Sequence, residues 1–221
     1  MAKKYIYAFA GEKTDGKADM KNLLGGKGAN LAEMASLGID VPPGFTISTD
    51  ACVYYLKNKN KLPPKLWNEV LAQLADLEKT IEKKFGDSND PLLVSVRSGA
   101  RVSMPGMMDT VLNLGLNESS VLGLAKKTQN EWFAFDTYRR FISMFGNVVL
   151  NISGESFESI LEKEKLKRGI KLDTDFSVRD LKAIVKKFKA FVLRETNKKF
   201  PDDPIKQLRM AVEAVFSSWN T

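Results

Sequence analysis

The sequence lacks histidine altogether and contains a single cysteine, Cys52, among its 221 residues. Without histidine the chain can form neither a Ser-His-Asp triad nor a histidine-ligated zinc site, and it cannot carry a phosphohistidine. One cysteine can neither close a disulfide within the chain nor build a cysteine-ligated metal centre. Any chemistry that the chain supports must therefore rest on Lys, Arg, Asp, Glu, hydroxyl groups and backbone amides.

Long hydrophobic runs are also missing from the sequence. No apolar segment approaches the roughly 20 residues that a transmembrane helix needs, and none of signal-peptide length follows the charged start Met1–Tyr5. Hydrophobic residues make up 43% and charged residues 28% of the chain, as in folded globular proteins. We therefore expect an intracellular protein without membrane contact, in the cytoplasm or in an organelle, with one sizeable core or a core and a smaller satellite.

The net charge of +7 is spread along the chain. The part before Asn151 contains 19 Lys and Arg against 16 Asp and Glu, and the part from Asn151 onward contains 15 against 11. A spread excess is typical of a solvated surface and not of a nucleic-acid-binding stripe. No zinc-finger spacing, aromatic-rich sheet motif or arginine tract accompanies it. We expect no nucleic-acid partner.

The first part of the sequence predicts strands alternating with helices. Aromatic and aliphatic residues alternate over Tyr5–Phe9, which predicts a first strand. A glycine cluster then leads into a predicted helix over Ala29–Leu37 that is closed at Gly38. A second strand is predicted at Phe45–Ser48, after a proline-rich turn.

Further helices and a third strand follow. Thr49 or Asp50 is predicted to cap a short helix over Ala51–Leu56. Apolar residues then recur at helical spacing and predict the buried stripe of a long amphipathic helix: Leu66, Val70, Leu74, Leu77 and Ile81. A short apolar run over residues 92–96 predicts the third strand.

From about Ser119 onward the pattern is helical almost throughout. One predicted helix has a stripe of Trp132, Phe133, Phe135, Tyr138, Phe141, Ile142 and Phe145. Another has a stripe of Val178, Leu181, Ile184, Val185, Phe188, Phe191 and Val192, and a last one covers Ile205–Trp219. We interpret these stripes as core. The whole pattern predicts an α+β fold, with a mixed portion over residues 1–117 completed by 203–221 and a helical portion over 118–202.

The segment Gly25-Gly26-Lys27-Gly28 is a candidate anion site. Glycines let the backbone approach a ligand closely, and the amides at the start of a helix favour an anion. A lysine in such a loop can meet a phosphate as a mobile point charge. The spacing is neither the Walker pattern nor the dinucleotide fingerprint. A turn with an exposed lysine at a helix start is an equally good interpretation of this segment alone.

A second candidate site follows the third predicted strand. Arg97 stands at the strand end, where a rigid element can present its planar fork to a phosphate. Gly99 and Gly106 would allow backbone amides near the same anion, and Thr110 could add a hydroxyl. The methionines of this segment, Met108 among them, offer apolar surface suited to a purine ring. The alternative is a surface arginine beside core methionines, but two anion-competent loops in one domain favour a nucleotide site.

The stretches that contain these loops, NLLGGKGANLAEM and DPLLVSVRSGARVSMPGMMDTVLNLGLN, closely resemble the N-terminal nucleotide-binding domain of the pyruvate, phosphate dikinase family. The segments VPPGFTIST, FAFDTYRRFISMFG and AVFSSWN are similar to the same family in the same order, so the resemblance covers nearly the whole chain. Alternatives are a phosphoenolpyruvate synthase-like ATP-grasp domain, whose sequence differs after the corresponding Val-Arg-Ser, and a non-catalytic binding or regulatory module.

The resemblance implies an ATP-grasp fold, in which ATP lies between two α+β subdomains. Such enzymes interconvert ATP, pyruvate and phosphate with AMP, phosphoenolpyruvate and diphosphate, using magnesium and a phosphohistidine on a separate domain. By motif, Lys27 and Arg97 match the phosphate-binding residues of the family. Gly106 and Thr110 fall in the loop that covers the nucleotide phosphates. Met108 and Asp109 are further candidate nucleotide contacts.

The sequence differs from the family in extent. The carrier histidine, the magnesium ligands and the adenine-side residues are expected outside this chain, so we assign it no catalytic residue and no metal ligand. We therefore expect a fragment that supplies one wall of an ATP site and is inactive alone. It should bind ATP weakly or not at all. We expect the fragment to be a monomer and the full-length enzyme a homodimer, with the phosphohistidine domain of the same protein as partner.

Overall fold

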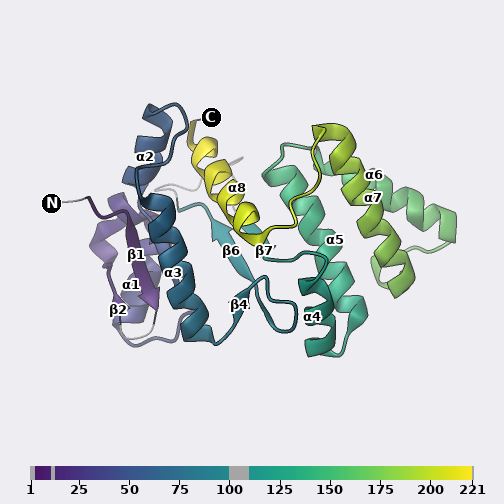
Figure 1. Cartoon of the computed structure of the whole chain (residues 1–221), viewed down its shortest axis with the longest axis horizontal. Helices are drawn as coiled ribbons and strands as arrows, with labels where there is room; N and C mark the ends of the chain where they lie inside the picture. The colour runs from purple at the N-terminus through teal and green to yellow at the C-terminus, as the bar shows by residue number, and fades with distance from the viewer. Residues whose placement is uncertain (1–2, 11–12, 100–109, 221) are drawn as a thin grey trace. The chain divides into compact units, whose positions relative to one another are not determined.

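The computed structural model describes residues 3–10, 13–99 and 110–220, and they form the α+β fold that the sequence predicts (Figure 1). The chain divides into two compact units. Unit 1 comprises the residues up to Glu82, together with the segments that begin at Arg97 and at Val215. Unit 2 comprises Lys83–Val96 and Thr110–Ala214. Each unit is therefore assembled from segments that are far apart in the sequence.

A three-stranded antiparallel sheet forms the start of unit 1. Its central strand β1 (Ile6–Ala10) pairs with β2 (Lys13–Thr14) and with β3 (Gly44–Ile47). The strands predicted to begin at Tyr5 and at Phe45 are confirmed to within one residue.

The helices of unit 1 are α1 (Lys21–Ser36), α2 (Thr49–Lys57) and α3 (Leu66–Ile81), with the 3-10 turn η1 (Ala18–Met20) before α1. Both α1 and α3 pack against β1. The predicted apolar stripe of α3 is confirmed at all but its last position by burial of Leu66, Val70, Leu74 and Leu77. Ile81 is only half-buried, because the helix ends there.

The start of α1 differs from the prediction. The helix begins at Lys21 and not at Ala29, so the glycine cluster lies inside the helical stretch, which is interrupted at Gly25. The predicted closure is confirmed, since Gly38 has a left-handed φ of 74° and its N–H donates to the carbonyl oxygen of Ala35 at 3.1 Å.

The predicted cap of α2 is wrong. The N-cap position is Ser48, whose side chain makes no capping hydrogen bond. Thr49 and Asp50 are engaged elsewhere: the Thr49 hydroxyl donates to the carbonyl oxygen of Asn22 at 2.8 Å, and Asp50 pairs with Lys3 at 3.0 Å. Long-range partners therefore replaced the local cap that the residue types favour.

Unit 2 begins with short strands. β4 (Lys84–Phe85) pairs in parallel with β5 (Pro91–Leu92), and β6 (Val94–Arg97) pairs with β7 (Thr110–Leu114). The single strand predicted over residues 92–96 is thus wrong in detail, because its residues pair with two different partners on either side of Leu93.

The rest of unit 2 is helical. Its helices are α4 (Ser120–Thr128), α5 (Glu131–Val148), α6 (Gly154–Arg168), α7 (Val178–Thr196) and most of α8 (Pro204–Ser217), with the 3-10 turn η2 (Asp173–Asp175). The end of α8, from Val215, and the 3-10 turn η3 (Ser218–Asn220) belong to unit 1. In Figure 1, α4 and α7 lie beside α5, and α6 lies beside α7. Within the described ranges, no helix is both long and apolar enough to cross a bilayer.

Aromatic rings fill the core of unit 2. The ring of Phe200 lies edge-on to those of Phe141 and Phe145, at centroid distances of 5.7 and 5.4 Å. The predicted stripe of α5 is confirmed from Phe135 onward and is wrong at Phe133, which is 45% exposed. The stripe of α7 is confirmed by its buried residues: Leu181, Ile184, Val185, Phe188, Phe191 and Val192.

Gln207 of α8 joins the helices of unit 2 to its strands. Its fully buried amide accepts a hydrogen bond from the N–H of Gly115 at 3.0 Å. The same amide donates to the carbonyl oxygens of Leu116 and Pro201 at 2.9 and 2.8 Å. A buried polar side chain with all these partners fixes the approach of α8 to the end of β7.

Candidate functional site

The glycine-lysine segment of unit 1 contains a break in a helix. Gly25 interrupts α1 with φ 69° and ψ 169°, a conformation that essentially only glycine adopts. The helix resumes at Gly26, so the first N–H groups of the resumed segment point toward its start without acceptors inside that segment. Lys27 lies in this turn and is exposed. The amides, the positive end of the helix dipole and the ammonium group together suit an anion.

The glycine-lysine segment touches the segment that follows Arg97. A Cβ placed on Gly25 would lie 1.4 Å from the carbonyl oxygen of Gly99, so no side chain fits between the two backbones. A Cβ placed on Gly99 would lie 3.3 Å from the carbonyl oxygen of Leu24. The two loops that the sequence predicts as separate anion sites therefore meet, backbone against backbone, inside one unit.

Arg97 is the last residue of β6 and is exposed. It forms no ion pair with any residue in the ranges 3–10, 13–99 and 110–220. A strand end is a rigid support for a guanidinium, which binds a phosphate through two parallel N–H groups. Lys27 and Arg97 thus extend from two loops in contact, one as a mobile point charge and the other as a planar fork.

The structure does not bring all predicted site residues together. Thr110 is the first residue of β7, half-buried, and it belongs to unit 2. Gly106, Met108 and Asp109 lie outside the described residues. Within unit 1, the structure places Lys27 and Arg97 on touching segments, and the binding roles of all six predicted residues stay predictions.

Ser98 and Trp219 contact each other beside Arg97, although the sequence gives neither of them a role in the predicted site. Ser98 is 4% exposed and lies between Arg97 and Gly99. The indole N–H of Trp219 donates to its hydroxyl oxygen at 3.3 Å. The pattern of α8 suggests core for Trp219, yet a half-buried indole N–H usually finds a hydrogen-bond partner. This tendency of the indole N–H was the only feature of the sequence that could have suggested a polar contact for Trp219.

No metal centre is present in the part of the chain that the structure describes. It contains no group of three or more Cys, Asp or Glu side chains that could hold an ion. Burial raises the pKa of the Cys52 thiol to about 12, so this side chain stays protonated and is a poor ligand.

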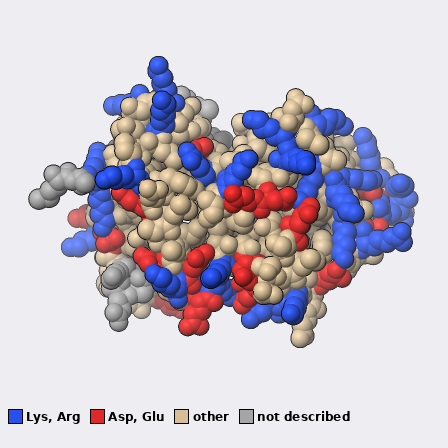
Figure 2. All heavy atoms as spheres, viewed as in Figure 1, with Lys and Arg blue, Asp and Glu red and all other residues tan. Residues whose placement is uncertain are grey.

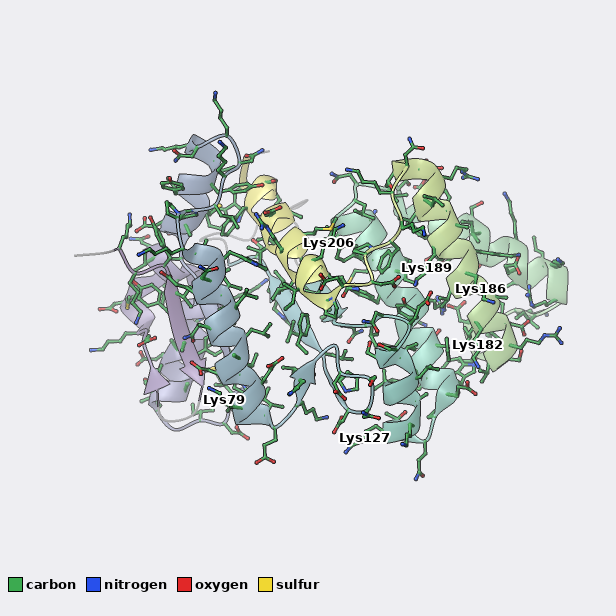
Figure 3. The ribbon with its side chains drawn as sticks, in the orientation of Figure 1. Lys79, Lys127, Lys182, Lys186, Lys189 and Lys206 are labelled. Carbon is green, nitrogen blue, oxygen red and sulfur yellow. The ribbon has the colours of Figure 1, made fainter. Side chains whose placement is uncertain are left out.

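A second group of cations lies on unit 2, where basic side chains gather over α6 and α7 (Figure 2). Lys189, labelled in Figure 3, meets Glu118 at 3.0 Å and Asp202 at 2.9 Å. The buried Arg139 meets Asp136 at 2.7 Å and Asp173 at 2.6 Å. Because Lys189 and Arg139 already have carboxylate partners, these two cations tie α7 and α5 to neighbouring segments of unit 2 and are not open to an anion.

An α+β unit that joins a glycine-lysine loop to an arginine loop has the parts of a phosphate-binding domain. A family model described as "Pyruvate phosphate dikinase, AMP/ATP-binding domain" matches residues 21–71 and 58–221. The chain belongs to this family.

Curated relatives agree with the family assignment. The chain is 54% identical over 219 residues to a chloroplastic pyruvate, phosphate dikinase of Flaveria pringlei, covering 99% of this chain and 23% of that protein. It is 52% identical over 221 residues to the chloroplastic pyruvate, phosphate dikinase 1 of Arabidopsis thaliana, covering 100% and 23%. Pyruvate, phosphate dikinase 2 of Zea mays is 52% identical over 216 residues, covering 98% and 24%. The chain thus spans about a quarter of the length of these relatives.

Proposed function

We propose that this chain forms one wall of the ATP site of a pyruvate, phosphate dikinase, with Lys27 and Arg97 holding the nucleotide phosphates. The single observation that carries the proposal is the backbone contact of Gly25 with Gly99, which joins the lysine loop to the arginine loop. The family supports nucleotide as the ligand, because its description names an AMP/ATP-binding domain.

The chemistry follows from the groups at the two loops. In phosphoryl transfer the protein chiefly positions the phosphates and neutralises their charge, and it does little covalent chemistry. The amides after Gly25 and the ammonium of Lys27 would hold one set of phosphate oxygens, and the fork of Arg97 a neighbouring set. Gly106, Met108, Asp109 and Thr110 would complete the cover over the nucleotide.

The remaining parts of the reaction belong to other parts of the enzyme. We infer an ATP-grasp arrangement in which a second subdomain supplies the adenine contacts and the magnesium ligands. A phosphohistidine on a further domain would accept the phosphoryl group. The net reaction interconverts ATP, pyruvate and phosphate with AMP, phosphoenolpyruvate and diphosphate. On this proposal the isolated chain binds ATP weakly and does not turn over, and a submicromolar dissociation constant would contradict that part.

The test separates the two halves of the reaction in the complete polypeptide that the gene encodes. Lys27→Ala and Arg97→Ala should each abolish the isotope exchange that depends on ATP and phosphate, and should leave the exchange between pyruvate and phosphoenolpyruvate unchanged. Lys186→Ala and Arg179→Ala are matched controls, because they remove the same side chains from exposed positions on α7. The proposal fails if the site variants keep the ATP half-reaction, or if the controls lose it equally.

A further inference from the structure

Trp219 makes a hydrogen bond to the segment that contains Arg97. Its indole N–H, which can only donate, reaches the hydroxyl oxygen of Ser98 at 3.3 Å. Because Ser98 is 4% exposed and directly follows Arg97, the indole holds the backbone turn from which the guanidinium extends. Both residues belong to unit 1.

The chain just before Trp219 is fixed to α2. The ring of Phe216 lies edge-on to that of Tyr55 at a centroid distance of 5.5 Å. The Cys52 thiol donates to the carbonyl oxygen of Phe216 at 3.7 Å, and the hydroxyl groups of Tyr55 and Ser217 lie 3.4 Å apart. The residues that precede Trp219, Phe216 and Ser217, are therefore held against α2 by ring packing and by polar contacts.

The same helix α2 is also fixed to the glycine-lysine segment. The hydroxyl of Thr49 donates to the carbonyl oxygen of Asn22 at 2.8 Å, three residues before Gly25. Gly25 in turn lies against Gly99. The contacts form a closed ring within unit 1, from α2 to the end of α8, through Trp219 to Ser98, across to Gly25 and back to α2.

We propose that Trp219 is a positioning residue for Arg97. The inference rests on the proposed function and adds a residue that sets how Arg97 stands relative to the lysine loop. The Trp219–Ser98 bond joins two side chains, so it can be removed without altering the backbone contact of Gly25 with Gly99. Its loss keeps that backbone contact but loosens the turn at Ser98 from which the guanidinium extends, which weakens the hold of Arg97 on phosphate.

The experiment measures ATP binding and the ATP half-reaction in the complete polypeptide. Trp219→Phe keeps a ring and removes the donor, and Ser98→Ala removes the acceptor. Loss of one neutral hydrogen bond should weaken ATP binding by about three- to tenfold in either variant. The double variant should be no weaker than the single ones, and the pyruvate half-reaction should not change. The matched control is Trp132→Phe, which removes an indole bond to the carbonyl oxygen of Phe176 at 2.7 Å in unit 2.

A double-mutant cycle between Trp219 and Arg97 tells whether Trp219 positions Arg97 or only stabilises the fold. In an Arg97→Lys background, which keeps the charge and loses the fork, Trp219→Phe should have little further effect on ATP affinity. Additive losses in that background would overturn the inference, as would unchanged affinity in both Trp219→Phe and Ser98→Ala, or an equal loss in Trp132→Phe. If Arg97→Lys and Lys27→Ala themselves leave the ATP half-reaction intact, the proposed function fails and not this inference alone.

Discussion

Gly25→Ala is the sharpest perturbation of the site. The new methyl group would lie 1.4 Å from the carbonyl oxygen of Gly99, so one of the two backbones must move. A residue with a side chain is also strained at φ 69° and ψ 169°. Such backbone strain costs about 1–3 kcal/mol, and overpacking costs about 1–3 kcal/mol more. We expect unit 1 to lose about 2–6 kcal/mol of unfolding free energy.

The neighbouring Gly26→Ala is the control. A Cβ there meets no atom within 4 Å, and the residue is helical. We expect its unfolding free energy to change by less than about 1 kcal/mol, in the stabilising direction.

Urea unfolding, monitored by tryptophan fluorescence, measures the unfolding free energy of both variants. A Trp132→Phe background leaves Trp67 and Trp219, which both report on unit 1. In the complete polypeptide, the ATP half-reaction should be lost in Gly25→Ala, since the loops that hold Lys27 and Arg97 separate. If Gly25→Ala and Gly26→Ala are equally stable, the backbones of Gly25 and Gly99 do not meet as described.

Three further predictions concern the rest of the chain. Hydrogen bonds from the Ser177 hydroxyl and from Arg168 lower the pKa of Asp180 to about 2, from an ordinary value near 3.8. The stability that Asp180 contributes is therefore present above pH 3.8 and is lost as the pH falls toward 2, and Asp180→Asn should reduce this dependence in melting curves between pH 5 and 2. Gln207→Leu leaves three buried backbone groups without this partner and, at about 1–3 kcal/mol for each, should cost about 3 kcal/mol or more in urea unfolding. Cys52, with its raised pKa and buried position, should resist alkylation at pH 8 in the native protein and react after denaturation.

The sequence predicted the parts of the site whose signals are local. A lysine among glycines and an arginine at a strand end are recognisable from residue type and spacing alone, and both were found in unit 1. Their contact could not be predicted, because it depends on two backbones far apart in the sequence meeting at Gly25 and Gly99. Trp219 was missed for the same reason, since its partner Ser98 is distant in the chain.

The fold shows the same division between local and long-range signals. The buried face of α3 was predicted correctly, because apolar residues recur along this helix at helical spacing. α6 was not predicted as a separate helix, since its sequence is mostly charged and its few buried residues include Glu164. That carboxylate is buried because Arg168 and Lys187 pair with it, and Lys187 comes from another helix. The cap of α2 was wrong because Thr49 bonds to Asn22 instead.

Formation of phosphoenolpyruvate from pyruvate by the complete polypeptide that the gene encodes tests the proposed function most directly. We expect product only when ATP and phosphate are both present, its loss in Arg97→Ala, and its retention in Arg179→Ala. Product formation without phosphate, or an Arg97→Ala variant as active as the wild type, would contradict the claim that these two loops form the phosphate-binding wall of a pyruvate, phosphate dikinase.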